Sequence, residues 1–141
     1  MYLLDINVLI ALAWDNHVHH ARAHAWFRNL GTTTFATCNL TQSGFVRLSM
    51  NPSVVHCQIA IADALAALES FTKHPSHRFC EDGALLSDSP AWQRVNSYKQ
   101  VTDTNLRLIA HHHGRKLVTF DEGIQNQLPD DEKIWVEVIP V

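Results

Sequence analysis

The chain opens with the stretch Leu3-Leu4-Asp5-Ile6-Asn7. This stretch places a carboxylate between an apolar strand, expected over 2–5, and a helix, expected over 6–14, where apolar residues recur at near-helical spacing. A strand followed directly by a helix is the unit from which parallel sheets with covering helices are built. The opening residues therefore predict an α/β fold.

The same alternation continues along the chain. Further strands are expected over 32–38, 77–80, 116–120 and 134–139. Further helices are expected over 17–30, 40–50, 57–71, 90–98, 103–113 and 122–128, with loops at 83–88 and 129–131. Strands that alternate with helices predict a mostly parallel central sheet covered on both faces, which is a three-layer α/β/α sandwich. Because the chain has no linker and no internal repeat, residues 1–141 are expected to form one domain.

Several helix boundaries are predicted from capping chemistry. Asn39 is expected to cap the helix that follows it, with Gln42 as its capping-box partner. Ser89 and Thr102 are expected to cap two later helices, because their hydroxyls can accept a free backbone N–H. Gly114 is expected to end the second of these helices.

Composition excludes several classes of protein. No apolar run approaches the roughly 20 residues that span a bilayer, and no basic segment of a signal peptide begins the chain. The cysteines Cys38, Cys57 and Cys80 are odd in number and widely spaced, which favours core thiols in a reducing compartment over disulfides or a zinc site. A cytoplasmic protein without a membrane contact is therefore expected.

The net charge of −3 argues against a protein that coats nucleic acid by bulk attraction. It does not exclude an enzyme that holds a few phosphates with local cations. The basic residues are scattered along the chain: Arg22, Arg28, Arg47, Arg94, Lys99, Arg107, Arg115 and Lys116. Whether they gather in space does not follow from the sequence.

Three aspartates lie at junctions between expected elements. Asp5 and Asp121 follow strands, and Asp103 opens a helix that leads back into the sheet. Each alone could simply cap a helix or complement its dipole. Because ligand sites of parallel sheets lie at the carboxyl ends of the strands, we expect the three to converge.

Converging carboxylates call for a cation. Two like charges about 4 Å apart repel by about 4 kcal/mol at an effective dielectric constant of about 20. Mg²⁺ or Mn²⁺ removes that cost and prefers oxygen ligands. Such an ion can activate water and neutralise phosphoryl oxygens. The sequence therefore predicts a metal-dependent phosphodiesterase, and a ribonuclease in particular.

Four segments carry a resemblance to a known family. They are Leu4-Asp5-Ile6-Asn7-Val8-Leu9, Thr41-Gln42-Ser43-Gly44-Phe45-Val46-Arg47-Leu48 with Asn51-Pro52, Thr102-Asp103, and Leu117-Val118-Thr119-Phe120-Asp121. In this order the chain resembles, over nearly its whole length, the PIN-domain ribonucleases and, within them, the VapC-type toxins of bacterial toxin–antitoxin pairs. The resemblance implies a homodimer, Mg²⁺ or Mn²⁺, cleavage of structured RNA such as tRNA or rRNA, and a cognate antitoxin that wraps the toxin.

The resemblance also assigns site residues by position. Asp5, Asp103 and Asp121 match metal-binding acids of the family, the first two as primary ligands. Asn7 and Thr119 match polar positions that support these ligands.

Gln42 departs from the family pattern, which usually has glutamate at this place and counts it among the catalytic residues. A neutral amide adds no charge and is a poor general base, so weaker cation binding is expected. The alternative function is a degenerate PIN domain that binds RNA or antitoxin without cleaving. Phosphoreceiver domains and aspartyl phosphatases fit less well, because no lysine follows the last strand and Asn7 stands where a phosphatase has a second aspartate.

The histidines suggest a second kind of metal site. His17, His20 and His24 could share one helical face, which is a ligand spacing. No glutamate lies between them as in zinc proteases, so a solvated surface or a rim that touches RNA is the favoured interpretation.

Overall fold

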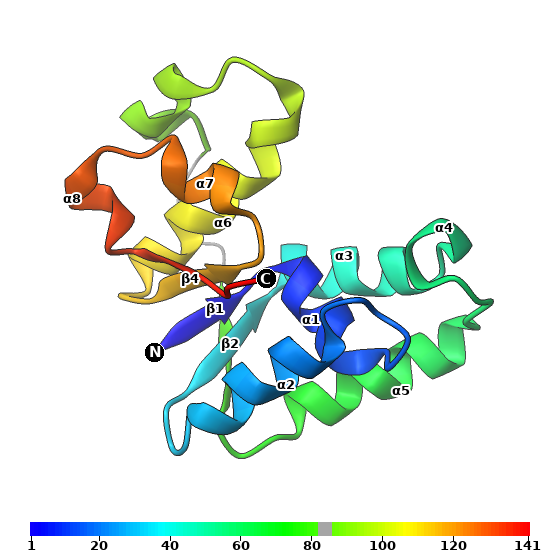
Figure 1. Cartoon of the computed structure of the whole chain (residues 1–141). Helices are drawn as coiled ribbons and strands as arrows, with labels where there is room; N and C mark the ends of the chain where they lie inside the picture. The colour runs from blue at the N-terminus through cyan, green and yellow to red at the C-terminus, as the bar shows by residue number, and fades with distance from the viewer. Residues whose placement is uncertain (82–85) are drawn as a thin grey trace.

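The computed structural model describes residues 1–81 and 86–141, and its centre is a parallel sheet (Figure 1). The strands are β1 (Tyr2–Leu4), β2 (Phe35–Cys38), β3 (His77–Cys80), β4 (Lys116–Thr119) and β5 (Val136–Val138). They lie in the order β3-β2-β1-β4-β5, and each neighbouring pair is parallel. All strands therefore end at the same edge. The expected mostly parallel sheet is confirmed and is parallel throughout.

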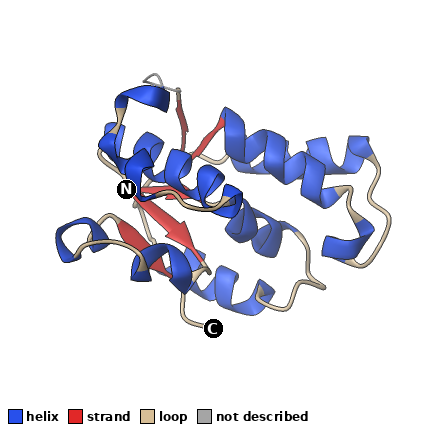
Figure 2. Cartoon of the chain, turned by 90° about the horizontal axis from the view of Figure 1, so that it is seen from above, coloured by secondary structure: helices blue, strands red, loops and turns tan. Residues whose placement is uncertain are grey.

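Helices cover both faces of the sheet. The described helices are α1 (Ile6–Ala13), α2 (His20–Asn29), α3 (Asn39–Ser49), α4 (Pro52–Val55), α5 (Ile61–Thr72), α6 (Val101–His112), α7 (Glu122–Asn126) and α8 (Asp130–Lys133). In Figure 1 the helices α1–α5, blue to green, lie on one side, and α6 lies on the other. Figure 2 shows the strands running between these two groups. None of the described helices has the length and apolar composition needed to cross a bilayer.

Alternation along the strands explains the two covering layers, because successive side chains of a strand face opposite sides. Leu4, Phe35 and Val118 pack with the buried residues of α1 and α3. The adjacent strand residues face the other side of the sheet; they are Leu3, Ala36 and Leu117. There they pack against α6, through Leu106, Ile109 and Ala110. The expected α/β/α sandwich is confirmed.

The start of α3 differs from the expected cap. The helix begins at Asn39 itself, and Cys38 is the N-cap residue. Thr41 closes the capping box, because its Oγ1 accepts the Cys38 N–H at 2.9 Å. No residue lies between the end of β2 at Cys38 and the start of α3 at Asn39. Both partners of the capping box therefore lie one position earlier than expected. The predicted pair of Asn39 and Gln42 was wrong.

The prediction of a helix over 90–98 was also wrong. Ser89 caps this segment as predicted, since its Oγ accepts the Ala91 N–H at 3.2 Å. The chain then forms two short 3-10 turns, η2 (Pro90–Arg94) and η3 (Tyr98–Gln100). Ser97 between them accepts the Lys99 N–H on its own side chain, a local bond that competes with helix formation.

Several other helix boundaries differ from the predicted ones. Helix α6 begins at Val101, so Thr102 lies inside its first turn and does not cap it. Gly114, with φ +63°, follows the end of α6 as predicted. Helices α4 and α8 were not expected, and α8 occupies most of the loop predicted over 129–131.

The loop expected over 83–88 falls partly on 82–85, which lie outside the described residues; its described end is the 3-10 turn η1 (Leu86–Asp88).

Candidate active site

Asp5 is the most buried acid of the candidate site. It follows β1 and caps α1, since its Oδ1 accepts the Ile6 N–H at 2.6 Å. Its Oδ2 accepts the Thr119 hydroxyl at 2.8 Å, and the residue is 5% exposed. Burial raises the pKa of Asp5, the two hydrogen bonds oppose this rise, and the charge of Asp121 adds to it. Asp5 is therefore a buried carboxyl group held in one orientation.

Thr119, the last residue of β4, connects two of the acids. Its hydroxyl donates to Asp5 and accepts the Asp121 N–H at 3.1 Å. Asp121 in turn caps α7, where its Oδ1 accepts the Gly123 N–H at 2.8 Å. Because β1 and β4 are parallel neighbours, the ends of both strands bring these groups to the same place.

Asp103 joins the group from the first turn of α6. Its pKa is raised to about 6, chiefly by burial and then by the negative charges of Asp5 and Asp121, while Arg107 acts in the opposite direction. Asp5 and Asp121 thus lie close enough to Asp103 to disfavour its ionisation.

A cavity of about 260 Å³ opens beside Asp103 and Asp121. Arg94, Lys99 and Arg107 line it as well. Arg107 lies four residues after Asp103 on α6, a spacing that places two side chains on one helix face, and this was the signal in the sequence that could have linked them. Arg94 and Lys99 come from the 3-10 turns, whose position relative to α6 no local pattern encodes.

Asn7 lies on another side of Asp121. Its side chain is exposed, and with Asp121, His17, His19 and Phe120 it lines a hollow of about 320 Å³. The rings of His19 and Phe120 lie 4.8 Å apart between centroids. Asp121 therefore borders two hollows, one lined by cations and one lined by rings.

The side chain of Gln42 is hydrogen-bonded to strand β2. Its Nε2 donates to Thr37 Oγ1 at 2.9 Å, and that hydroxyl lies 2.8 Å from His77 Nε2. Burial lowers the pKa of His77, which favours a neutral ring that accepts the Thr37 hydroxyl. Within residues 1–81 and 86–141, no hydrogen bond joins Gln42 to the three aspartates.

Two of the histidines with metal-ligand spacing contact main-chain carbonyl oxygens. His20 Nδ1 lies 2.8 Å from the Ala11 carbonyl oxygen, and His24 Nε2 lies 2.9 Å from that of Leu12. These carbonyls belong to the last turn of α1 and have no partner within the helix. The ring nitrogens therefore complete the C-terminal end of α1.

The donor chemistry of the acidic group suits a hard cation. In the part of the chain that the structure describes, no three histidine, cysteine, aspartate or glutamate side chains lie close enough to hold a metal ion by themselves. Mg²⁺ usually keeps several waters and takes only one or two carboxylates, so full enclosure is not required. A cation would also relieve the repulsion that raises the pKa of Asp103. A Mg²⁺ or Mn²⁺ ion beside Asp5, Asp103 and Asp121 would therefore take part of its coordination from water.

Comparison with known proteins points to one family. The PIN domain family model matches residues 2–128. The chain is 43% identical over 141 residues to Ribonuclease VapC38 of Mycobacterium tuberculosis, covering 100% of this chain and 99% of that protein. It is 42% identical over 124 residues to Ribonuclease VapC39 of the same organism, covering 86% of this chain and 89% of that protein.

A solved structure agrees in fold. The crystal structure of M. tuberculosis VapC20, described as a Sarcin-Ricin loop cleaving toxin, matches with a TM-score of 0.64 at 16% identity. The match covers 89% of this chain and 94% of that chain. At this identity the likeness concerns the fold alone.

Proposed function

Since the chain belongs to the PIN-domain family and, within it, to the VapC ribonucleases, we propose that Asp5, Asp103 and Asp121 form the cation site at which it cleaves RNA. Membership makes the chain an RNA-cleaving enzyme; the site, the ion and the class of RNA are the proposal. The observation that carries it is the hydrogen-bonded path from Asp5 through Thr119 to Asp121, beside an Asp103 whose pKa both acids raise.

Each residue has a part in the proposed site. Asp5 and Asp103 are the primary ligands of Mg²⁺ or Mn²⁺, and Asp121 is the third acid. The Thr119 hydroxyl orients Asp5, and Asn7 supports the site beside Asp121 at the surface. When bound, the ion supplies Lewis acidity, which neutralises charge on phosphoryl oxygens and acidifies water. The expected reaction is in-line hydrolysis of a phosphodiester.

Gln42 stands where the family pattern has glutamate, and we propose that the site therefore binds its cation with one carboxylate fewer. Gln42→Glu is expected to tighten Mg²⁺ binding at neutral pH, because a fourth carboxylate is added to the three aspartates of the site. Calorimetric titration of both proteins measures this, and equal dissociation constants would contradict it.

The substrate class and partners extend the proposal. VapC20 is described as cleaving the sarcin–ricin loop, which supports structured RNA, such as rRNA or tRNA, as the substrate here. A cognate antitoxin, a homodimer and action in the cytoplasm are the further expectations. One domain over 1–141 is proposed as well, because β5 lies beyond the matched residues and still pairs with β4.

The direct test is cleavage of total RNA in Mg²⁺ and in Mn²⁺, beside Asp5→Ala. Wild type is expected to cut and the variant to be inactive. Equal inactivity of both, with RNA binding intact, would favour the alternative that the chain only binds. Sequencing the 5′ ends of the fragments then identifies the RNA and the bond.

A further inference from the structure

The cavity beside Asp103 and Asp121 carries charges that the cation site does not use. Arg94, Lys99 and Arg107 line it together with those two acids. Building on the proposed function, we propose that these cations form a subsite for a phosphate of the RNA backbone next to the bond that is cleaved. In this subsite Glu132 is a positioning residue that holds the two arginines.

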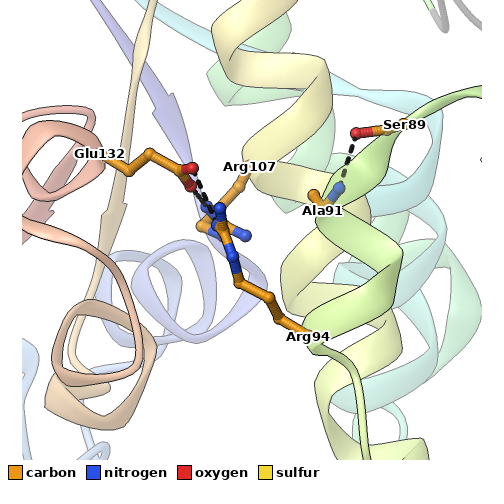
Figure 3. Close-up of polar contacts among 5 residues, drawn as sticks. All are labelled: Ser89, Ala91, Arg94, Arg107 and Glu132. Atoms are coloured by element: carbon orange, nitrogen blue, oxygen red, sulfur yellow. Dashed lines mark hydrogen bonds and ion pairs between the residues drawn. The ribbon is translucent and has the colours of Figure 1, made fainter.

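Glu132 of α8 bridges both arginines, as Figure 3 shows. Its Oε1 lies 2.8 Å from Arg94 Nη1, and its Oε2 lies 3.2 Å from Arg107 Nη1. The Arg107 side chain is 15% exposed and that of Arg94 is 50% exposed, so one guanidinium is sheltered and the other is accessible. Three elements distant in sequence, η2, α6 and α8, thus meet in one charged cluster.

The cluster has more donors than Glu132 uses. A guanidinium carries five N–H donors in a planar fork, and the recorded contact to Glu132 involves one nitrogen of each arginine. The planar fork matches a phosphate better than a point charge does. Both arginines lower the pKa of Glu132, so the carboxylate stays ionised and keeps them in place.

The charge balance favours an anion once the acids are neutralised. Glu132 offsets one of the three cations, and Asp103 and Asp121 of the same cavity offset the other two in the ion-free chain. With the proposed cation bound to these two acids, the cluster keeps two positive charges. Asp103 and Asp121 line the same cavity. A phosphate bound there would therefore lie beside the proposed cation site. The Arg94 side chain is half exposed, and exposed ion pairs add little to folding stability, so stability alone gives a weak reason for its contact with Glu132.

RNA binding as a function of salt tests the subsite. The probe is a labelled RNA hairpin, bound by the full chain in chelator, where the proposed mechanism cannot cleave it. Lys99→Gln and Arg94→Gln should each reduce the slope of log affinity against log salt by about 0.7 to 0.9, the value for one lost phosphate contact. The melting temperature of each variant confirms that it is folded.

Matched controls remove the same charges elsewhere. Lys116→Gln alters the exposed first residue of β4, at the edge of the sheet opposite to the acids. Arg28→Gln alters an exposed residue in the last turn of α2. Both should leave the slope near that of wild type. If the cavity variants change the slope no more than these controls, the subsite does not exist.

Glu132→Gln tests the positioning role. This variant keeps both arginines and removes one negative charge, so RNA affinity should stay equal or rise. Cleavage should nevertheless slow about tenfold in kcat, because the guanidiniums are no longer held in one place. A fall in affinity, or an unchanged kcat, would overturn the positioning role.

The proposed function and the phosphate subsite are contradicted by different results. A wild-type chain that cleaves no RNA defeats the proposed function, while the salt slopes still decide the subsite. A wild-type chain that cleaves, with cavity variants that behave like the controls, defeats the subsite alone.

Discussion

At the scale of single residues, Asp5 and Asp121 combine a cap with a place in the acidic group. Each uses one carboxylate oxygen to accept a backbone N–H at the start of a helix. The capping interpretation and the functional interpretation are therefore compatible. The cap fixes the orientation of a carboxylate, and a fixed carboxylate is what a cation site requires.

Thr119→Val tests the connection between these acids. The change removes the hydroxyl that donates to Asp5 and accepts from Asp121 while keeping the volume of the side chain. Mg²⁺ affinity and kcat/KM are expected to fall about tenfold to a hundredfold, as for other groups that orient metal ligands. Thr119→Ser keeps the hydroxyl and is the control. Should valine and serine variants be equally active, Thr119 does not orient the site.

Asp103→Asn is expected to stabilise the ion-free protein while abolishing cleavage. The pKa of Asp103, about 6 in the folded state, lies above its ordinary value of 3.8. The folded state therefore binds more protons than the unfolded state between these values, and stability falls as pH rises through that window. After allowance for solvent screening, the gain at pH 7.5 is about 1 kcal/mol, or about 3 °C in Tm.

Thermal melts in chelator at pH 5 and pH 7.5 check this sign. The advantage of Asp103→Asn over wild type should be larger at pH 7.5. The comparison between the two proteins cancels the shifts of His17 and His77, whose lowered pKa values act in the opposite direction. An advantage that shrinks toward pH 7.5 would refute the charge repulsion.

At the scale of elements, the contact between α1 and α3 determines how Asp5 is presented. Gly44 of α3 lies against Ile6, and a Cβ added at Gly44 would overlap Ile6 Cδ1 and lie 2.9 Å from its Cγ1. Ile6 is also the residue whose N–H binds Asp5. Ile6 therefore links the close packing of α1 and α3 to the orientation of Asp5.

Gly44→Ala is expected to destabilise the protein by about 1–2 kcal/mol, because overpacking outweighs the better helix propensity of alanine. It should also lower activity, since a displaced Ile6 moves the cap of Asp5. Adding Ile6→Val removes the Cδ1 atom that alanine meets. A double-mutant cycle by denaturant unfolding should show a favourable coupling, and strict additivity would contradict the proposed contact.

At the scale of the whole molecule, a cation and the fold are expected to stabilise each other. An ion that binds only the folded chain raises its stability with concentration. Mg²⁺ should raise the Tm of wild type more at pH 7.5 than at pH 5, because Asp103 must be ionised to bind it. Asp103→Asn should lose most of this effect. Equal Mg²⁺ effects on both proteins would place the ion elsewhere.

The order of elements and the acidic positions could be read from the sequence. Strand alternation, helical periodicity and the junctions at Asp5 and Asp121 all depend on residues that are neighbours in the chain. These patterns predicted the α/β/α sandwich with a mostly parallel sheet, and the resemblance of four short segments predicted the family. Local patterns are weaker near the 3-10 turns, where side chains such as Ser97 bind their own backbone and stop a helix.

The sequence by itself therefore determined the alternation of the strands with the longer helices and the acids at their junctions, because backbone geometry and burial follow the spacing of nearby residues. Only the tertiary structure decided that Gln42 binds Thr37 and that Glu132 brings Arg94 and Arg107 to one cavity. The physical reason is that contacts between distant residues depend on strand order and helix packing. Both are set by the free energy of the whole fold, to which many weak interactions along the chain contribute.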